Sequence, residues 1–148
     1  MKKLIILLFP LLVLMACEKR DRQQIIPNVP VEVRITTNDP NYTDINILGS
    51  AVYIPGGYRG IILIHTFTDE YVAFDQACTH HINEGCAKVV LDESGIFMRC
   101  GQYGDTTFTA CCTSRFRTDG SVMEGPAEYP LKAYRVNKSG ALIEITNY

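Results

Sequence analysis

The residues best suited to chemistry lie between positions 78 and 112 of this 148-residue chain. This stretch holds five of the six cysteines and two of the three histidines, namely Cys78, His80, His81, Cys86, Cys100, Cys111 and Cys112. Thiolates and imidazoles are metal ligands, and thiols outside the cytosol also pair as disulfides. Because one residue separates Cys78 from His80, a single loop can offer a sulfur and a nitrogen to neighbouring metal atoms. The stretch therefore predicts metal ligands, disulfides or both.

Short strands flank these residues and must position them. From residue 31 the chain consists of short runs rich in Val, Ile, Thr and Tyr, separated by turn residues such as Pro55-Gly56-Gly57. No run shows the period of an amphipathic helix. The pattern predicts an all-β domain whose loops carry the cysteines and histidines. The expected strands are 31–37, 45–54, 60–67, 71–75, 88–92, 95–99, 129–136 and 141–146.

The N-terminus predicts export from the cytosol. An apolar run, 4–15, follows Lys2 and Lys3, and it is too short for a membrane span of about 20 residues but suits a signal peptide. The sequence Leu14-Met15-Ala16-Cys17 resembles the lipobox of bacterial lipoproteins. This resemblance implies cleavage after residue 16 and a lipid on Cys17; an ordinary cleaved signal or an uncleaved anchor is the alternative. We therefore expect a protein of the cell envelope, lipid-anchored and facing the periplasm or the outside.

The remaining chain divides into a tether and one domain. Residues 17–30, after the signal peptide at 1–16, combine alternating charges, glutamines and prolines without an apolar face, which is typical of a linker. Residues 31–148 are long enough for one folded domain. The formal net charge of −2 and the absence of a basic block argue against nucleic acid as a partner.

A series of short motifs between residues 60 and 136 resembles the Rieske domain family. The matching pieces, in order, are Ile61-Ile62-Leu63-Ile64, Tyr71-Val72-Ala73-Phe74-Asp75, Cys78-Thr79-His80, Ser114-Arg115-Phe116, Asp119-Gly120, Gly125-Pro126-Ala127, Pro130-Leu131 and Tyr134-Arg135-Val136. The resemblance implies an antiparallel β-sandwich or barrel with two ligand-bearing loops around a two-iron two-sulfur (2Fe–2S) cluster. It also implies one-electron transfer, with Cys78 and His80 as the ligands from the first loop.

The second loop departs from the family pattern Cys-Pro-x-His-Gly-Ser-x-Phe. Counting back from Phe116 places Ser114 on the serine and Cys112 on the histidine, and no histidine exists in this part of the chain. If a cluster binds, Cys112 must replace the imidazole and Cys100 must supply the other ligand, with residues 101–110 looped out. Ser114 then occupies the position that donates a hydrogen bond to a sulfur.

The resemblance also implies a disulfide between Cys86 and Cys111, because some family members tie their two ligand loops in this way. The competing pair, Cys111 with Cys112, would close a strained ring. A cluster-free domain is a further alternative, in which Cys112 pairs with Cys78 or Cys100 and the protein is a structural or binding lipoprotein.

Two other readings of the same residues concern zinc and catalysis. Cys78, His80, Cys100 and Cys112 would also suit a zinc ion. No orienting residue or oxyanion element accompanies a Cys112–His80 pair, so we expect at most electron transfer rather than enzymatic catalysis.

Overall fold

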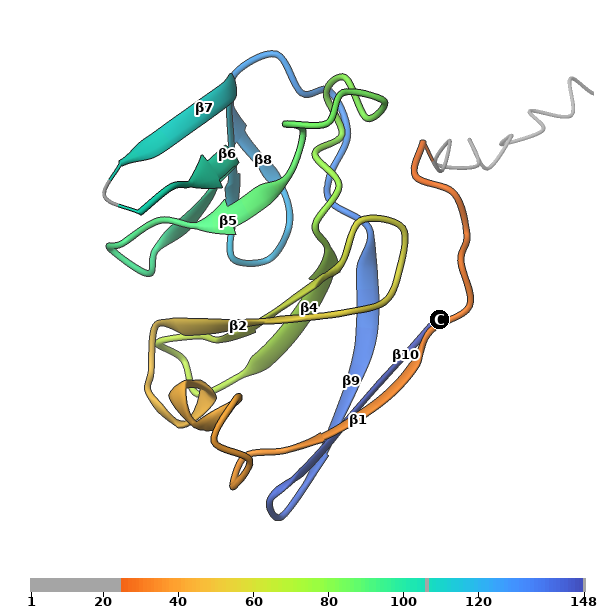
Figure 1. The fold of residues 1–148 in the computed structure, drawn as a ribbon, viewed down its shortest axis with the longest axis vertical. Helices are drawn as coiled ribbons and strands as arrows, with labels where there is room; N and C mark the ends of the chain where they lie inside the picture. The colour runs from red at the N-terminus through yellow and green to blue at the C-terminus, as the bar shows by residue number, and fades with distance from the viewer. Residues whose placement is uncertain (1–24, 106, 148) are drawn as a thin grey trace, which may run out of the picture.

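A computed structural model describes residues 25–105 and 107–147 (Figure 1). This part of the chain contains ten strands and one 3₁₀ helix. In chain order they are β1 (Glu32–Thr36), η1 (Thr43–Asn46), β2 (Ser50–Ile54), β3 (Ile61–His65), β4 (Tyr71–Asp75), β5 (Val89–Leu91), β6 (Phe97–Tyr103), β7 (Phe108–Arg117), β8 (Val122–Glu124), β9 (Ala133–Ser139) and β10 (Leu142–Thr146).

The first sheet has six antiparallel strands in the order β1-β10-β9-β4-β3-β2 and curls around a core of its own. Strand β3, which lies between β4 and the edge strand β2, reads Ile-Ile-Leu-Ile-His and is buried over its whole length. Because side chains alternate between the two faces of a strand, Ile61 and Leu63 join this core while Ile62 and Ile64 face the other way. An uninterrupted apolar strand therefore lies between two cores.

The second sheet has four antiparallel strands in the order β5-β6-β7-β8 and packs over the opposite face of β3 and β4 (Figure 1). The core between the sheets contains Phe74, Met98 and the fully buried Phe116, together with Cys78 and Cys100. Burial of a side chain such as Phe116 stabilises the fold by about 2–3 kcal/mol. Two of the cysteines thus lie at the end of a close-packed apolar layer.

The predicted all-β sandwich is confirmed, and the strand boundaries differ in instructive places. Strand β4 begins and ends where the sequence predicts, whereas residues 45–46 belong to η1 rather than to β2. The sequence pattern missed β7 and β8. Ser, Thr and Cys alternate there without a strong apolar signal, and only Ser114 and Phe116 of β7 are buried.

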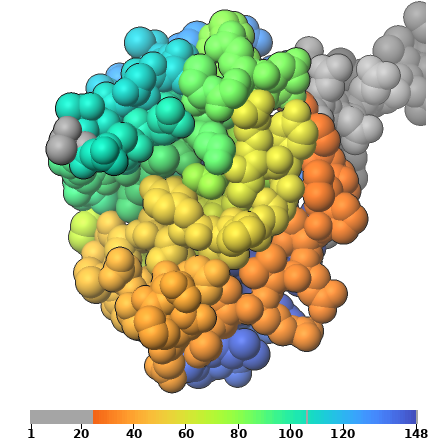
Figure 2. Space-filling view, in the orientation of Figure 1, coloured from red at the N-terminus to blue at the C-terminus, as the bar shows by residue number. Residues whose placement is uncertain are grey.

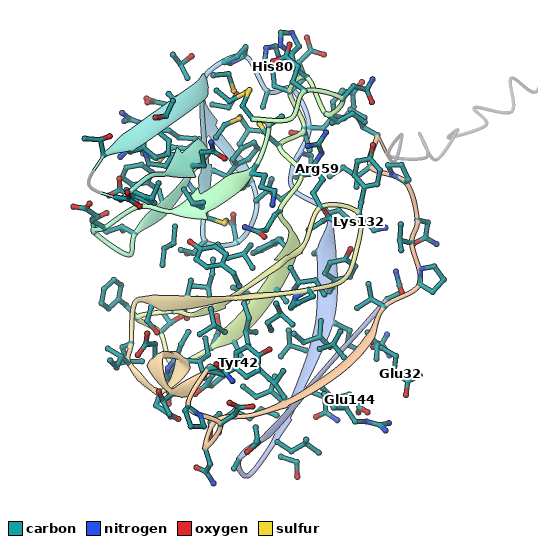
Figure 3. All side chains as sticks on the ribbon, in the orientation of Figure 1. Glu32, Tyr42, Arg59, His80, Lys132 and Glu144 are labelled. Atoms are coloured by element: carbon teal, nitrogen blue, oxygen red, sulfur yellow. A yellow bond between two sulfur atoms is a disulfide. The ribbon has the colours of Figure 1, made fainter. Side chains whose placement is uncertain are left out.

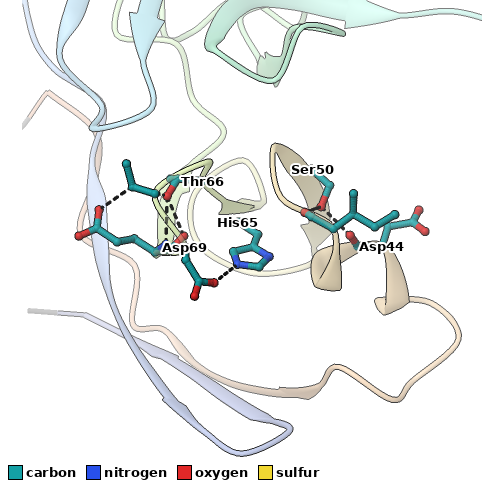
Figure 4. Close-up of polar contacts among 8 residues, drawn as sticks. Asp44, Ser50, His65, Thr66 and Asp69 are labelled. Atoms are coloured by element: carbon teal, nitrogen blue, oxygen red, sulfur yellow. Dashed lines mark hydrogen bonds and ion pairs between the residues drawn. The ribbon is translucent and has the colours of Figure 1, made fainter.

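Polar contacts close the end of the first sheet that lies away from the cysteines (Figure 4). The buried His65 Nε2 lies 2.8 Å from Asp69 Oδ1 across the β3–β4 turn. Thr66 Oγ1 accepts the backbone N–H of Glu70, and Ser50 Oγ lies within hydrogen-bond distance of the carbonyls of Asp44 and Ile47. These bonds satisfy backbone groups that would otherwise be unpaired at the strand ends.

The N-terminal part of the described chain lies against the domain, along its right-hand side in Figure 2. Ile26 is buried, and the Lys132 ammonium donates to the carbonyl of Pro27 and to Asn28 Oδ1. Residues 25–30, the end of the predicted tether, therefore have packing contacts of their own. The predicted signal peptide and Cys17 lie outside the described residues. Within residues 25–105 and 107–147, no helix is long and apolar enough to cross a membrane.

Candidate metal centre

The first ligand loop starts from a buried carboxylate at the end of β4. Asp75 is fully buried, and its oxygens accept hydrogen bonds from the backbone N–H groups of Tyr58, Arg59 and Ala77 and from Tyr134 Oη, at 2.6–3.2 Å. One side chain thus joins the β2–β3 turn, β9 and the first residues of the loop.

Cys78 follows in a backbone that is held on both sides. Its N–H donates to the carbonyl of Ala87 at 3.0 Å, and Ala77 forms a bridge with Lys88. Thr79 Oγ1 donates to the carbonyl of Tyr129 at 2.6 Å. The backbone that carries the buried Cys78 thiol is therefore held by hydrogen bonds to Ala87 and Tyr129 and by the bridge to Lys88.

Arg59 holds the rest of this loop. Its Nη2 donates to the carbonyl of Ile82 at 2.7 Å, and its Nη1 lies 3.4 Å from the carbonyl of Gly85. Figure 3 shows Arg59 between the first sheet and the loop that carries His80. The motif that ends at Asp75 gave no sign of this role, and no motif contained Arg59, because both act through contacts that only the fold brings together.

The second ligand segment is a widened part of the β6–β7 hairpin. Arg99 pairs with Arg115 and Gly101 pairs with Ala110, so that Cys100 alone lies opposite the four residues 111–114. Beyond this bulge, residues 101–103 pair with residues 108–110 as a two-stranded extension. The expectation that these residues loop out to bring Cys100 and Cys112 to one site is met in this form.

Three thiols meet between the two segments. The Sγ atoms of Cys78, Cys100 and Cys112 all lie within 4.8 Å of one another, and those of Cys78 and Cys112 are 3.9 Å apart. Two thiolates on one tetrahedral metal ion with bonds of about 2.3 Å would be about 3.8 Å apart. All three cysteines are free, with Cys78 and Cys100 buried and Cys112 half-buried. The arrangement suits thiolate ligation of a metal.

Hydrogen bonds among the thiols shift the pKa values of Cys78 and Cys100 in opposite directions. A hydrogen bond with Cys100 lowers the pKa of Cys78 to about 7; burial opposes this shift, and the N–H of His80 and the thiol of Cys112 support it. The same contact with Cys78, together with burial, raises the pKa of Cys100. One thiolate is thus stabilised at the centre by a neighbouring S–H group.

Ser114 lies directly beside the thiols. Its hydroxyl oxygen is 3.2 Å from Cys112 Sγ and accepts the backbone N–H of Ala127 at 3.1 Å. In this structure the Cys112 thiol donates to the Ser114 hydroxyl, so the donation from Ser114 to a sulfur that the resemblance implied stays a prediction.

The two ligand segments are joined by a disulfide between Cys86 and Cys111, 25 residues apart. This is the pair implied by the resemblance, and the alternative pair Cys111–Cys112 is not formed. The carboxylate of Glu84 lies 3.7 and 3.8 Å from the two sulfurs. The disulfide fixes the bulge of the second segment against the first loop.

The two histidines of the first loop lie at the same end of the molecule. Figure 3 shows His80 beside the sulfur atoms at the top of the domain, and its ring stacks on that of His81 at 3.7 Å. His81 Nδ1 also lies 3.2 Å from Glu84. His80 is not among the groups whose ligand atoms lie within 4.8 Å of all three thiols. The structure therefore brings three of the four predicted ligands together, and it leaves His80, two residues after Cys78 on the first loop, outside that group.

Comparison with known proteins rests on the fold. No protein-family model matches the chain, and no curated protein matches it. The plasma membrane Rieske protein PetC3 of the cyanobacterium Synechocystis PCC 6803 superposes with a TM-score of 0.55 at 19% identity, covering 76% of this chain and 97% of that one. The ferredoxin of carbazole 1,9a-dioxygenase from Nocardioides aromaticivorans IC177 gives a TM-score of 0.51 at 16% identity, with 82% and 100% covered. The described chain is thus a domain with the Rieske fold.

Proposed function

We propose that this protein binds a 2Fe–2S cluster through Cys78, Cys100, Cys112 and His80 and transfers single electrons. The observation that carries the proposal is the meeting of three free cysteines, from two segments tied by a disulfide, at one end of a Rieske fold. A bound cluster would supply a one-electron redox couple. The donor types are right, since thiolates and imidazoles are the ligands that such clusters accept.

The donor set predicts a low reduction potential. Three thiolates and one imidazole place more negative charge on the irons than two of each, and greater negative charge favours the oxidised form. With Cys112 bound as a thiolate, the Ser114 hydroxyl 3.2 Å from its sulfur would donate a hydrogen bond to it and oppose this effect. We expect the additional charge to outweigh a single hydrogen bond.

The proposed location of this electron transfer rests on the lipid predicted for Cys17. With a lipid on Cys17, the domain would face the periplasm or the outside from the membrane surface, and a disulfide is stable in such a compartment. Its partner would then be another redox protein of the cell envelope. A lipid on Cys17 is tested by Cys17→Ala, which should leave an unprocessed precursor or a soluble form in membrane fractionation.

The test of the cluster is anaerobic iron–sulfur reconstitution of the mature protein. We expect a brown protein with two irons and two sulfides per chain and a rhombic electron paramagnetic resonance signal after reduction with dithionite. Cys100→Ser and Cys112→Ser should lose this signal, whereas the matched control Cys86→Ser/Cys111→Ser should keep it. A colourless wild-type protein without iron or zinc would contradict the proposal.

A further variant tests the ligand role of Cys112. Cys112→His exchanges a thiolate for a neutral imidazole, so the reduction potential should rise and become pH-dependent. Protein-film voltammetry at several pH values measures both effects. A potential that is unchanged from wild type would exclude Cys112 as a ligand.

The sulfur distances also favour a second candidate, a cluster-free structural lipoprotein. With their Sγ atoms 3.9 Å apart, Cys78 and Cys112 need little movement to form a disulfide, releasing two electrons and two protons to an oxidant. Peptide mapping without reduction distinguishes the candidates. A Cys78–Cys112 disulfide in the purified protein would remove two ligands and favour the cluster-free form.

A further inference from the structure

The bulge in the β6–β7 hairpin opens a cavity on the outer face of the second sheet. The cavity measures about 260 Å³ and is lined by Arg99, Phe108, Ala110, Cys112, Thr113, Ser114, Arg115 and Glu124. Arg99 and Arg115 lie on one side of the bulge, and Phe108 and Ala110 lie on the other. The cavity thus lies where the two strands separate, and it reaches the half-buried Cys112.

Two arginines lie directly opposite each other at the edge of this cavity. Arg99 and Arg115 are cross-strand partners, so their side chains leave the same face of the sheet. Like charges in this position destabilise a strand pair. The fold compensates with one carboxylate for each arginine, since Arg99 Nη1 lies 2.8 Å from Asp92 and Arg115 Nη1 lies 2.9 Å from Glu124.

Aromatic rings further hold the two guanidinium groups. The Cζ atom of Arg99 is 3.6 Å from the centre of the Phe108 ring, and that of Arg115 is 5.1 Å from the centre of Phe97. Stacking on a ring leaves the edge of a guanidinium free to donate hydrogen bonds. Each arginine has five N–H groups, and its carboxylate partner occupies only part of them. Donors therefore remain for a further anion.

From these contacts we infer that the cavity binds a small carboxylate with a short apolar body. The two guanidinium groups bind its carboxylate, and Phe108 and Ala110 contact the apolar part. Thr113 completes the polar wall of the cavity. Its volume is below that of a typical drug-sized ligand site and suits a ligand of about ten non-hydrogen atoms. Such a ligand would lie beside Cys112, and its binding does not require a metal centre.

The test uses benzoate as the probe and ligand-observed saturation-transfer NMR on the mature protein, with benzamide as the uncharged control ligand. We expect saturable binding of benzoate and none of benzamide. Arg115→Gln should weaken benzoate at least tenfold and Arg99→Gln should weaken it similarly. Glu124→Gln, which releases Arg115 from its partner, should tighten binding. The matched control is Arg34→Gln on β1, whose arginine pairs with Glu32 and Glu144 far from the cavity.

Three outcomes would overturn the inference. Benzoate binding that is unchanged in both Arg115→Gln and Arg99→Gln would place the ligand elsewhere. Equal binding of benzamide would show that charge is not recognised, and tighter binding of inorganic phosphate than of benzoate would exclude a carboxylate site. Circular dichroism of each variant establishes that it is folded. Because the readout is ligand binding, failure here leaves the proposed cluster untouched, and a protein without iron can still bind benzoate.

Discussion

The two segments that meet at the thiols are built differently. The first loop, from Asp75 to Lys88, is held at many points by hydrogen bonds of Asp75, Arg59 and Thr79. The second segment has few such restraints. Strands β6 and β7 separate at the bulge, and the extension formed by residues 101–103 and 108–110 is largely exposed. The first loop holds the Cys-x-His motif of the Rieske resemblance, whereas Cys112, at the position where the family pattern has histidine, lies in the second segment.

The largest effect on stability should come from loss of the Asp75 carboxylate, which holds the start of the first loop. Asp75→Ala leaves three backbone N–H groups and the Tyr134 hydroxyl without their acceptor, all close to the core. We expect the free energy of unfolding to fall by about 3–5 kcal/mol. Urea denaturation measures the loss, with Asp39→Ala as the control, a half-buried turn carboxylate that accepts hydrogen bonds only from Asn41 among the described residues. A loss below about 1 kcal/mol would show that the first loop does not depend on this carboxylate.

The disulfide between the segments should rank next. Cys86→Ser removes a link that closes a 25-residue separation, and we expect a loss of about 2–4 kcal/mol. Reduction of the wild-type protein should lower its stability by a similar amount and should have no effect on the variant. If oxidised wild type and Cys86→Ser unfold at the same urea concentration, the bulge is held by the strands alone.

The Arg59 contacts should contribute less to global stability but more to the order of the loop. Arg59→Leu removes the donors to the carbonyls of Ile82 and Gly85, which should cost about 1–2 kcal/mol. Amide hydrogen exchange in residues 82–87 should become faster, with little change in β3 or β9. The exposed Arg34→Leu is the control, and uniform acceleration across all strands would contradict a local role.

The smallest effect is expected from shortening the second segment. Residues 102–109 can be replaced by Asn-Gly, which connects the paired residues Gly101 and Ala110 through a two-residue turn. Because the extension contributes no side chain to either core, we expect a change in unfolding free energy within about 1 kcal/mol. A larger loss would mean that the extension supports the thiol site, and the comparison between the segments would then have to be revised.

The sequence predicted the features that depend on local residue patterns and on the order of motifs along the chain. Apolar runs of β-branched residues located most strands of the first sheet, and the motif series led to the Rieske fold, the Cys86–Cys111 pair and the looped-out residues 101–110. Strand β7 was missed because its outward side chains are Thr, Cys and Arg and only one of its faces is buried, so the strand has no long apolar run. The hydrogen bonds of Asp75 and the cross-strand pair Arg99 and Arg115 were missed. They depend on backbone contacts and on strand register, which the spacing of residues along the chain does not reveal.

The packing of residues 25–30 along the domain limits how far the domain could lie from a lipid on Cys17. Since Ile26 is buried and Pro27 is held by Lys132, only the eight residues 18–25 remain between the domain and the proposed lipid on Cys17. A fully extended chain of that length spans at most about 29 Å. The domain would therefore remain within one protein diameter of the bilayer. Under the proposed lipid attachment and electron transfer, a redox partner would have to come to the membrane surface.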